Sequence, residues 1–296
     1  MVGFEPIEQT PDAIFDLLAD ETRLAIVREL GDAEGSISFA ELRKRVGVRD
    51  SGRFNYHLDK LTGRFVSKRE DGYTLTRAGR QIDGTLRAGT YTLAADLEPI
   101  ALDEPCPTCG STQQLRYEDQ LVRTECDCSV AAQFHVPPSG LAGESRETFP
   151  TACDRYLKTA LYKSRRGFCM YCDGSVEPSV RPLALPGGSP GDLPFAFDRP
   201  KDVPVVEMTC RRCGRALVSG LSLALLDHPT VVSFYSDRNR TAKDRPFWAV
   251  KGFGTDRERV RERDPFRAAV TYDIGGNSLT LTVDKTLTVL ETARER

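Results

Sequence analysis

Eight of the nine cysteines stand in close pairs, and all nine follow residue 105. The pairs are Cys106 and Cys109 in CPTCG, Cys126 and Cys128 in CDC, Cys169 and Cys172 in CMYC, and Cys210 and Cys213 in CRRCG. Two thiolates that are separated by two residues can hold one metal ion in tetrahedral geometry. Because disulfides are disfavoured in the cytoplasm, where we expect this chain to reside, the spacing predicts metal binding.

The simplest grouping of the pairs follows the order of the chain, although pairing across the groups stays open. The first site would be Cys106, Cys109, Cys126 and Cys128, joined by a hairpin in LRYEDQLVRTE. The second would be Cys169, Cys172, Cys210 and Cys213, around the Pro/Gly-rich RPLALPGGSPGDLP. Gly110 and Gly214 directly follow a cysteine, and glycine allows the tight turn that points amides at sulfur. Four thiolates leave no open coordination position, which predicts two structural zinc ions; iron, held as in rubredoxin, is the alternative.

Other residues with metal or catalytic chemistry lack the spacing that would give them a role. Cys153 lies in TACDRYLKTALYKSRRG, a predicted helix, and we interpret it as a small buried apolar residue rather than a redox thiol. His135 and His228 could replace a cysteine ligand, but neither stands at ligand spacing. The chain has no phosphate-cradling Gly-rich loop, no HExxH motif and no open Cys/His constellation. The sequence therefore predicts a protein that is not an enzyme.

The segment DSGRFNYHLDKL, residues 50–61, has a second kind of chemistry. As a helix it would present on one face the side chains of Arg53, Asn55, Tyr56 and Lys60. The opposite face would carry Phe54, Leu58 and Leu61, with His57 at its edge as a packing residue. A helix of this kind can pack through one face and contact nucleic acid through the other.

Charge is distributed unevenly along the chain, although the formal net charge is only -2. Residues 1–37 contain two basic and nine acidic side chains, whereas residues 38–87 contain twelve basic and six acidic ones. Acidic surface elsewhere does not cancel a basic face beyond a Debye length. The basic segment therefore favours phosphate binding.

Capping residues and apolar periodicity predict the elements around this helix. Helices should begin after the caps Thr10, Asp20, Ser38 and Asp50. Ser38 and Glu41 have capping-box spacing, and glycines should end the second and third helices. The dipeptide Asp71-Gly72 predicts a hairpin with Lys68 and Arg69 beside its tip. This order predicts a winged helix-turn-helix, with residues 51–62 in the major groove and a wing over residues 65–76 on the DNA backbone.

Residues 10–95 resemble the ArsR-type winged-helix transcriptional regulators, archaeal members in particular. ETRLAIVREL and FNYHLDKL carry the resemblance. It implies that Arg53, Asn55 and Tyr56 approach base edges and that Lys60, Lys68 and Arg69 lie near phosphates. Family members that sense metals place a Cys-x-Cys pair where this chain reads FAELRKRVG. We therefore do not expect metal sensing at that position.

A further helix should begin near Thr76, with an apolar stripe of Ala78, Ile82, Leu86 and Leu93. In winged-helix repressors such a helix often pairs with its twin, so we predict a homodimer. Two-fold symmetry would place the recognition helices one DNA turn apart, about 34 Å.

The half after the first cysteine mixes predicted helices and strands. LSLALLDHPTVVSFYSDR reads as two helices hinged near Pro229, and PFRAAVTYDIGGNSLTLTVDKTLTVLET reads as strands joined at Gly275-Gly276. GFCMYCDGSV, TCRRCGRAL and DHPTVVSFY resemble the zinc-ribbon-bearing C-terminal domain of haloarchaeal ArsR-like regulators. That resemblance implies no particular ligand.

Together these features predict an α+β protein of two domains, a winged helix-turn-helix over residues 1–98 and a zinc-ribbon-containing domain over residues 99–296. The expected function is sequence-specific regulation of transcription on double-stranded DNA, with the second domain serving dimerisation or effector sensing. The alternative is a general transcription accessory factor that contacts RNA polymerase at promoters. The chain shows no basic n-region at its start and no long apolar run, so we expect a cytoplasmic protein with no membrane partner.

Overall fold

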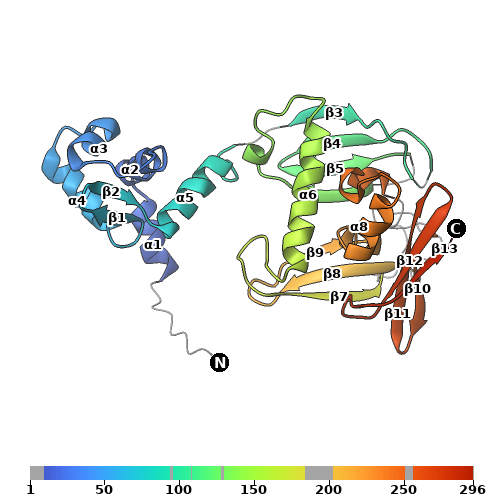
Figure 1. The fold of residues 1–296 in the computed structure, drawn as a ribbon. Helices are drawn as coiled ribbons and strands as arrows, with labels where there is room; N and C mark the ends of the chain where they lie inside the picture. Colours follow the sequence, from blue (N-terminus) through green and yellow to red (C-terminus); the bar gives the residue numbers. More distant parts are fainter. Residues whose placement is uncertain are drawn as a thin grey trace. The chain divides into compact units, whose positions relative to one another are not determined.

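The computed structural model of the chain describes residues 10–93, 96–107, 109–127, 130–183, 203–250 and 256–295. The chain divides into two compact units, Met1–Leu93 and Ala94–Arg296, which we call unit 1 and unit 2. The predicted boundary after residue 98 falls inside strand β3 (Leu97–Ala101), which pairs with β4 (Gln114–Glu118) of unit 2 (Figure 1). The boundary predicted from the sequence was therefore a few residues late.

The helices of unit 1 begin where their caps predict. They are α1 (Pro11–Leu18), α2 (Glu21–Gly31), α3 (Phe39–Val46), α4 (Ser51–Leu61) and α5 (Arg77–Ala88). Asp50 Oδ1 accepts a 2.6 Å hydrogen bond from the Arg53 N–H, so the cap of α4 satisfies a donor that helix geometry leaves free. The predicted capping box of α3 is only half formed: Ser38 accepts from the Glu41 N–H, but the Glu41 carboxylate accepts from Arg45 at 2.9 Å.

The hairpin of unit 1 turns one residue earlier than predicted. Strands β1 (Val66–Arg69) and β2 (Gly72–Leu75) pair Arg69 with Gly72, so the turn residues are Glu70 and Asp71. Gly72 has a φ of 148°, and a Cβ atom there would lie 2.3 Å from the Ile37 carbonyl oxygen. The glycine is needed because the Ile37 backbone pairs with the neighbouring Tyr73, not because it sits in the turn.

Apolar side chains from three helices meet at the core of unit 1. Ile26, Leu42, Phe54, Leu58 and Leu61 are completely buried, which confirms the apolar face predicted for α4. Burial of each such side chain contributes roughly 1.5–3 kcal/mol. Because three of the five lie on α4, packing fixes which face of that helix points outward.

Helix α5 is held to α2 by charge and by close packing. Arg87 donates to Asp83 within α5 and to Asp32 after α2, both at 2.8 Å. Of the predicted dimer stripe, Ala78 and Ile82 pack against the core of their own unit. The stripe is therefore only partly available to a second copy, and the homodimer stays a prediction.

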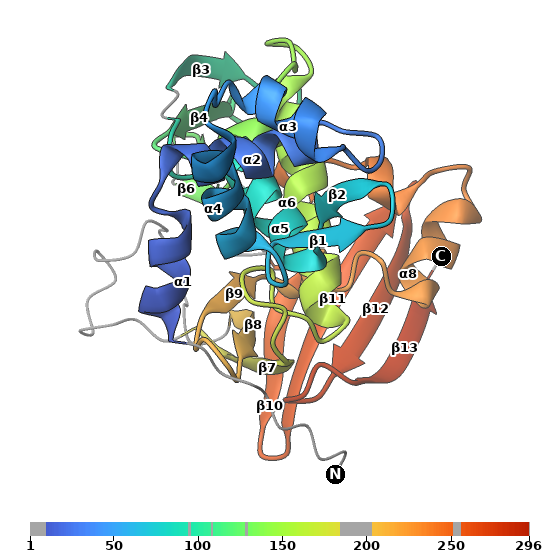
Figure 2. The same ribbon diagram turned by 90° about the vertical axis from the view of Figure 1, so that its left-hand side faces the viewer.

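Unit 2 combines three antiparallel sheets with helices (Figures 1 and 2). The first has the order β3-β4-β5-β6, with β4 (Gln114–Glu118), β5 (Leu121–Glu125) and β6 (Val130–His135). The second has the order β7-β8-β9, with β7 (Val176–Pro182), β8 (Pro204–Cys210) and β9 (Ala216–Ser219). The third has the order β10-β11-β12-β13, with β10 (Glu258–Arg263), β11 (Phe266–Ile274), β12 (Asn277–Val283) and β13 (Val289–Glu295).

Helices connect these sheets and complete one hydrophobic core. They are η1 (Pro138–Gly140), α6 (Phe149–Arg165), α7 (Leu221–Ala224), α8 (Pro229–Ser236), η5 (Ala242–Asp244) and η6 (Phe247–Ala249). Figure 1 shows α6 running from the first sheet to the second. The predicted helix around Cys153, the helix pair hinged at Pro229 and the strands joined at Gly275-Gly276 are all confirmed.

Among the described residues, no helix combines the length and the apolarity needed to cross a membrane.

A buried carboxyl group links the third sheet to α7. Glu258 is 2% exposed and accepts hydrogen bonds from the N–H groups of Leu221 at 3.0 Å and Ser222 at 2.6 Å. Tyr272 donates to the Ser222 carbonyl oxygen beside them at 2.9 Å. Burial raises the pKa of Glu258 to about 7. Hydrogen bonds from the Ser222 side chain and from the two backbone N–H groups act in the opposite direction and offset part of this rise.

Replacing Gly72 by Ala should destabilise unit 1. The new Cβ atom would collide with the Ile37 carbonyl, so we expect a loss of about 2 kcal/mol or more in the free energy of unfolding, measured by far-UV circular dichroism in urea. Gly84→Ala is the matched control: it lies in α5 with open space around it and should be neutral or stabilising by up to about 1 kcal/mol. Equal effects of the two variants would contradict this account.

Glu258 should make the stability of unit 2 depend on pH. Between the ordinary pKa of 4.5 and the folded value of about 7, the folded chain holds a proton that the unfolded chain has lost. Stability should therefore fall as pH rises through this window, on the order of 1 kcal/mol per pH unit. Glu258→Gln should flatten that slope, measured by urea unfolding followed through Trp248, the sole tryptophan. An unchanged slope would show that Glu258 is not the group that titrates.

Candidate metal centres and nucleic-acid surface

Two groups of cysteines come together in the described part of unit 2. Cys169, Cys172, Cys210 and Cys213 form one, and Cys106, Cys109 and Cys126 form the other, with the sulfur atoms of each group within 4.8 Å of one another. The predicted grouping by chain order is therefore confirmed for these seven residues. Cys128, the fourth predicted ligand of the first group, lies outside the described residues.

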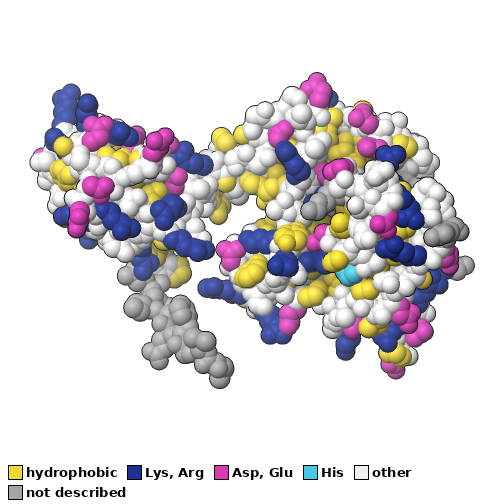
Figure 3. Space-filling model, viewed as in Figure 1, with side chains coloured by type: hydrophobic (Ala, Val, Ile, Leu, Met, Phe, Trp, Pro, Cys, Tyr) yellow, Lys and Arg dark blue, Asp and Glu magenta, His cyan; other side chains and the backbone are white. Residues whose placement is uncertain are grey.

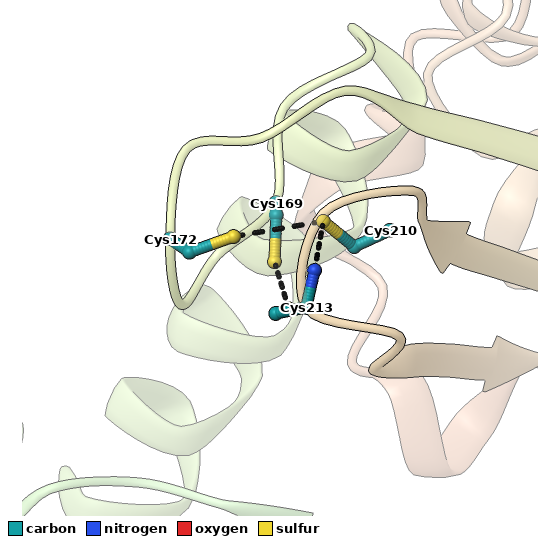
Figure 4. A group of neighbouring side chains, drawn as sticks. All are labelled: Cys169, Cys172, Cys210 and Cys213. Atoms are coloured by element: carbon teal, nitrogen blue, oxygen red, sulfur yellow. Dashed lines mark hydrogen bonds between the residues drawn. The ribbon is translucent and has the colours of Figure 1, made fainter. Parts of the chain in front are cut away.

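The four-cysteine cluster joins two loops that are distant in sequence (Figure 4). Cys169 and Cys172 follow α6, whereas Cys210 and Cys213 lie at the turn between β8 and β9. The Sγ atoms of Cys169 and Cys213 are 3.7 Å apart, and those of Cys172 and Cys210 are 3.5 Å apart. These distances are far longer than a disulfide bond. They are close to the sulfur–sulfur edge of about 3.8 Å expected when sulfurs bind a tetrahedral zinc ion at about 2.3 Å.

The same backbone turn presents the cysteines in three of the pairs. The residue after the second cysteine donates its N–H to the carbonyl of the first, at 2.9 Å for Cys106, 3.2 Å for Cys169 and 3.0 Å for Cys210. This residue has positive φ in each turn: Gly110 at 76°, Asp173 at 56° and Gly214 at 71°. In two of these turns the glycine indicated the positive φ from the sequence. The turn at Asp173 was not predicted, because the residue there is not glycine; its carboxylate accepts a 2.6 Å hydrogen bond from Lys163.

Gly174 is a site residue that sequence reasoning missed. A Cβ atom there would lie 2.8 Å from the Cβ atom of Arg212, 3.1 Å from Cys210 Sγ and 3.2 Å from Cys172 Sγ. The two loops can therefore approach each other only where this position lacks a side chain. The sequence CMYCDG contains the glycine, but nothing in it indicates that the contact is with the opposite loop.

Backbone donors and neighbouring thiols set the ionisation of the cluster. The N–H of Cys213, together with that of Arg212, lowers the pKa of Cys210 to about 6. The Gly174 N–H acts in the same direction on Cys172, but burial and the other three thiols raise its pKa to about 12. One thiolate therefore forms readily, whereas ionising all four requires a cation to offset their repulsion. The residues present fit a divalent metal ion.

The three-cysteine cluster has comparable dimensions. Cys126 Sγ lies 3.4 Å from Cys106 Sγ and 3.8 Å from Cys109 Sγ. Cys106 follows β3, and Cys126 follows β5 directly. Trp248 Nε1 donates a 2.6 Å hydrogen bond to the carboxylate of Glu104, which lies two residues before Cys106. The fluorescence of this tryptophan should therefore respond to changes in the loop of the first cluster.

Cys153 and the histidines stand apart from both clusters. Cys153 is completely buried in the core, which confirms the prediction of a small buried residue, and burial raises the pKa of its thiol to about 12. His135 lies on β6, and His228 caps α8 by accepting the Thr230 N–H at its Nδ1. Neither belongs to a group of metal-binding side chains in the described residues.

The residues predicted to contact DNA lie on the surface of unit 1. All six are exposed: Arg53, Asn55, Tyr56 and Lys60 on α4, and Lys68 and Arg69 on the hairpin. The Lys60 ammonium lies 5.5 Å from the centre of the Tyr56 ring, and Asn55 donates to Asp59 at 2.8 Å. His57 is buried, with its Nδ1 3.3 Å from Asp20 Oδ1, which confirms that it packs rather than faces outward. The polar face of α4 is thus free of the core.

Two family models match the chain, and both are described as domains of unknown function. A family model described as a domain of unknown function, DUF7351, matches residues 103–289, which is more than half of the chain. The chain therefore belongs to this family. A second domain of unknown function, DUF7347, matches residues 11–86. Comparison with curated proteins and with solved structures gives no match.

The purified chain should carry two metal ions, which we expect to be zinc. Cys213→Ser should remove one ion per chain and lower the melting temperature, because an oxygen replaces one of four thiolate ligands. Cys128→Ser should remove the other ion if this residue completes the first site. Metal content is measured by inductively coupled plasma mass spectrometry.

Cys153→Ala is the control for these variants. It removes a thiol from the core without touching either cluster, so the metal content should not change. An iron signal with visible colour would contradict zinc, and two ions retained in Cys213→Ser would contradict the assignment of this ligand.

Proposed function

We propose that this protein is a sequence-specific DNA-binding regulator of transcription. In this proposal unit 1 is a winged helix-turn-helix, and α4 is the helix that enters the major groove. The observation that carries the proposal is the division of α4 into two faces. Phe54, Leu58 and Leu61 are completely buried, while Arg53 and Tyr56 on the opposite side are exposed.

The elements around α4 support this interpretation. Helices α2, α3 and α4 precede the β1–β2 hairpin in the order typical of winged helices. Ile37, just before α3, pairs with Tyr73 of β2 and so joins the hairpin to the helices. This bridge holds the hairpin beside the helical core, where the exposed Lys68 and Arg69 could contact phosphates while α4 contacts bases.

The residues divide by chemistry into two roles. Arg53, Asn55 and Tyr56 would contact base edges, because guanidinium and amide groups match the donor and acceptor pattern of the major groove. Lys60, Lys68 and Arg69 would contact phosphates. The side chain of Asn55 would first release Asp59, to which it donates here.

Unit 2 would contribute structure, pairing or effector recognition rather than catalysis. We propose that both clusters hold structural zinc, since a complete set of thiolates leaves no coordination site for a reacting water molecule. Zinc bound by Cys169 and Cys210 would fix the end of α6 to the turn between β8 and β9.

A general transcription accessory factor is the second candidate. The feature that favours it is the presence of cysteine clusters that follow, in the sequence, the basic segment of residues 38–87. The two candidates differ in what they need. A regulator recognises a DNA sequence by itself, whereas an accessory factor requires RNA polymerase and has no preferred sequence.

Selection from randomised duplex DNA, with the full chain and no polymerase, should enrich one sequence. Arg53→Ala should then reduce the preference for that sequence by about 1–3 kcal/mol, because a base contact is lost. Lys68→Ala should weaken binding to all sequences alike and lower the salt dependence by about one ion, as expected for a phosphate contact. Fluorescence anisotropy at several salt concentrations measures both effects.

Arg28→Ala is the matched control, because Arg28 is exposed on α2 and its removal changes the charge equally. It should leave both quantities unchanged. Failure to enrich any sequence, or equal effects of Arg53→Ala and Arg28→Ala, would overturn the regulator proposal. Binding that appears only when polymerase is added would favour the accessory factor.

A further inference from the structure

Aromatic and basic side chains are exposed together around the four-cysteine cluster. Tyr162, Phe168 and Tyr171 are 51%, 56% and 52% exposed. Arginines accompany them, and we name the whole set the ribbon face: Tyr162, Arg166, Phe168, Tyr171, Arg212 and Arg215. Figure 3 shows hydrophobic and basic side chains interleaved on unit 2 at the end of α6 beside β9. None of these residues is needed as a metal ligand.

Two of the aromatic rings lie beside a guanidinium group. The Arg215 guanidinium is 4.8 Å from the centre of the Tyr171 ring, and the Arg166 guanidinium is 5.9 Å from the centre of the Tyr162 ring. Such pairs hold a flat apolar ring and a positive charge side by side at the surface. Within the described part of the chain, Arg166, Arg212 and Arg215 have no ion-pair partner.

The ribbon face keeps a positive charge when the metal is counted. Residues 162–177 contain three basic and two acidic side chains, and residues 209–218 contain three basic ones; Asp227, which pairs with Arg165, is counted with them, which gives +3. A zinc ion with four thiolates adds −2 and leaves +1. The whole chain has a formal net charge of −2. The positive charge is therefore local to this face.

Ion pairs connect the segments that form the ribbon face. Lys163 at the end of α6 binds Asp173 in the first loop at 2.6 Å. Arg211 in the second loop pairs with Glu177, at the start of β7. Tyr171 also lines a hollow of about 370 Å³ that is mostly apolar and is bounded by β6, α6 and β9. The Tyr171 ring thus lies beside a hollow that has room for a further aromatic ring.

We propose that the ribbon face binds single-stranded nucleic acid. Bases would stack on Tyr171, Tyr162 and Phe168, and backbone phosphates would pair with the unpaired arginines. Stacking of this kind requires bases that are free of a duplex. The role is therefore distinct from that of α4, and it does not depend on the winged-helix proposal.

An acidic protein segment would use the arginines but would gain little from three exposed rings. Single-stranded nucleic acid is the partner that uses both kinds of side chain, because every base offers a flat face and every nucleotide a charge.

The test is the affinity of the full, zinc-loaded chain for a fluorescent oligothymidylate, measured by anisotropy. Tyr171→Ala should weaken binding by about 5- to 150-fold, the range for the loss of one stacked base, and Tyr171→Phe should restore it. Arg212→Ala should reduce the slope of log affinity against log salt by about 0.7. Zinc content and circular dichroism should match those of the unaltered chain.

Two control variants separate this surface from the rest of the molecule. Tyr91→Ala removes a tyrosine that is 80% exposed in unit 1, and Arg261→Ala removes an exposed arginine on β10. Neither should change oligothymidylate binding. Arg53→Ala should not change it either, so loss of duplex recognition and loss of single-strand binding are distinguishable results.

The proposal is overturned if the unaltered chain does not bind oligothymidylate, or if Tyr171→Ala binds as tightly as the control variants. A competition experiment tests whether an acidic protein segment binds the same surface. Displacement of the oligonucleotide by poly-glutamate as effectively as by unlabelled oligothymidylate would assign the ribbon face to an acidic protein partner instead.

Discussion

Repulsion between closely spaced thiolates is the constraint on which the arrangement of unit 2 depends. Sulfur atoms 3.5–3.7 Å apart cannot all ionise unless a cation lies among them. The loops nevertheless converge there, with backbone N–H groups aimed at Cys210 and with Gly174 allowing the contact. The end of α6 and the β8–β9 turn are thereby held in one place. The segments that carry the ribbon face therefore meet at the four-cysteine cluster.

The N-terminal unit reaches its organisation by a different route, since none of its residues is a cysteine. The orientation of α4 is fixed by burial: the apolar face of this helix lies in the core, and the hairpin is joined to the helices through Ile37 and Tyr73. Exposed charges on the outer face of α4 do not disturb this core, because the buried apolar side chains lie on the opposite face of the helix. The outer face of α4 is therefore free for the DNA contacts that we propose.

Much of both units could be predicted from local patterns, and the reason is visible at particular residues. Caps such as Asp50 act within three residues, and pairs such as Cys210 and Cys213 lie within one turn, so their geometry is local. The hairpin shows where local patterns fail. Asp71-Gly72 has the composition of a turn, but Gly72 is required by the Ile37 carbonyl, which belongs to a segment more than thirty residues earlier.

The sequence by itself determined the helix starts, the buried face of α4 and the identity of the cysteine pairs, since each rests on spacing along a single element. Tertiary structure decided which pairs share a cluster, why Gly174 has no side chain, and that Tyr171 and Arg215 belong to one surface. These depend on distances between segments that are far apart in the chain. Such distances are set by the packing of the whole unit, which no local pattern of residues encodes.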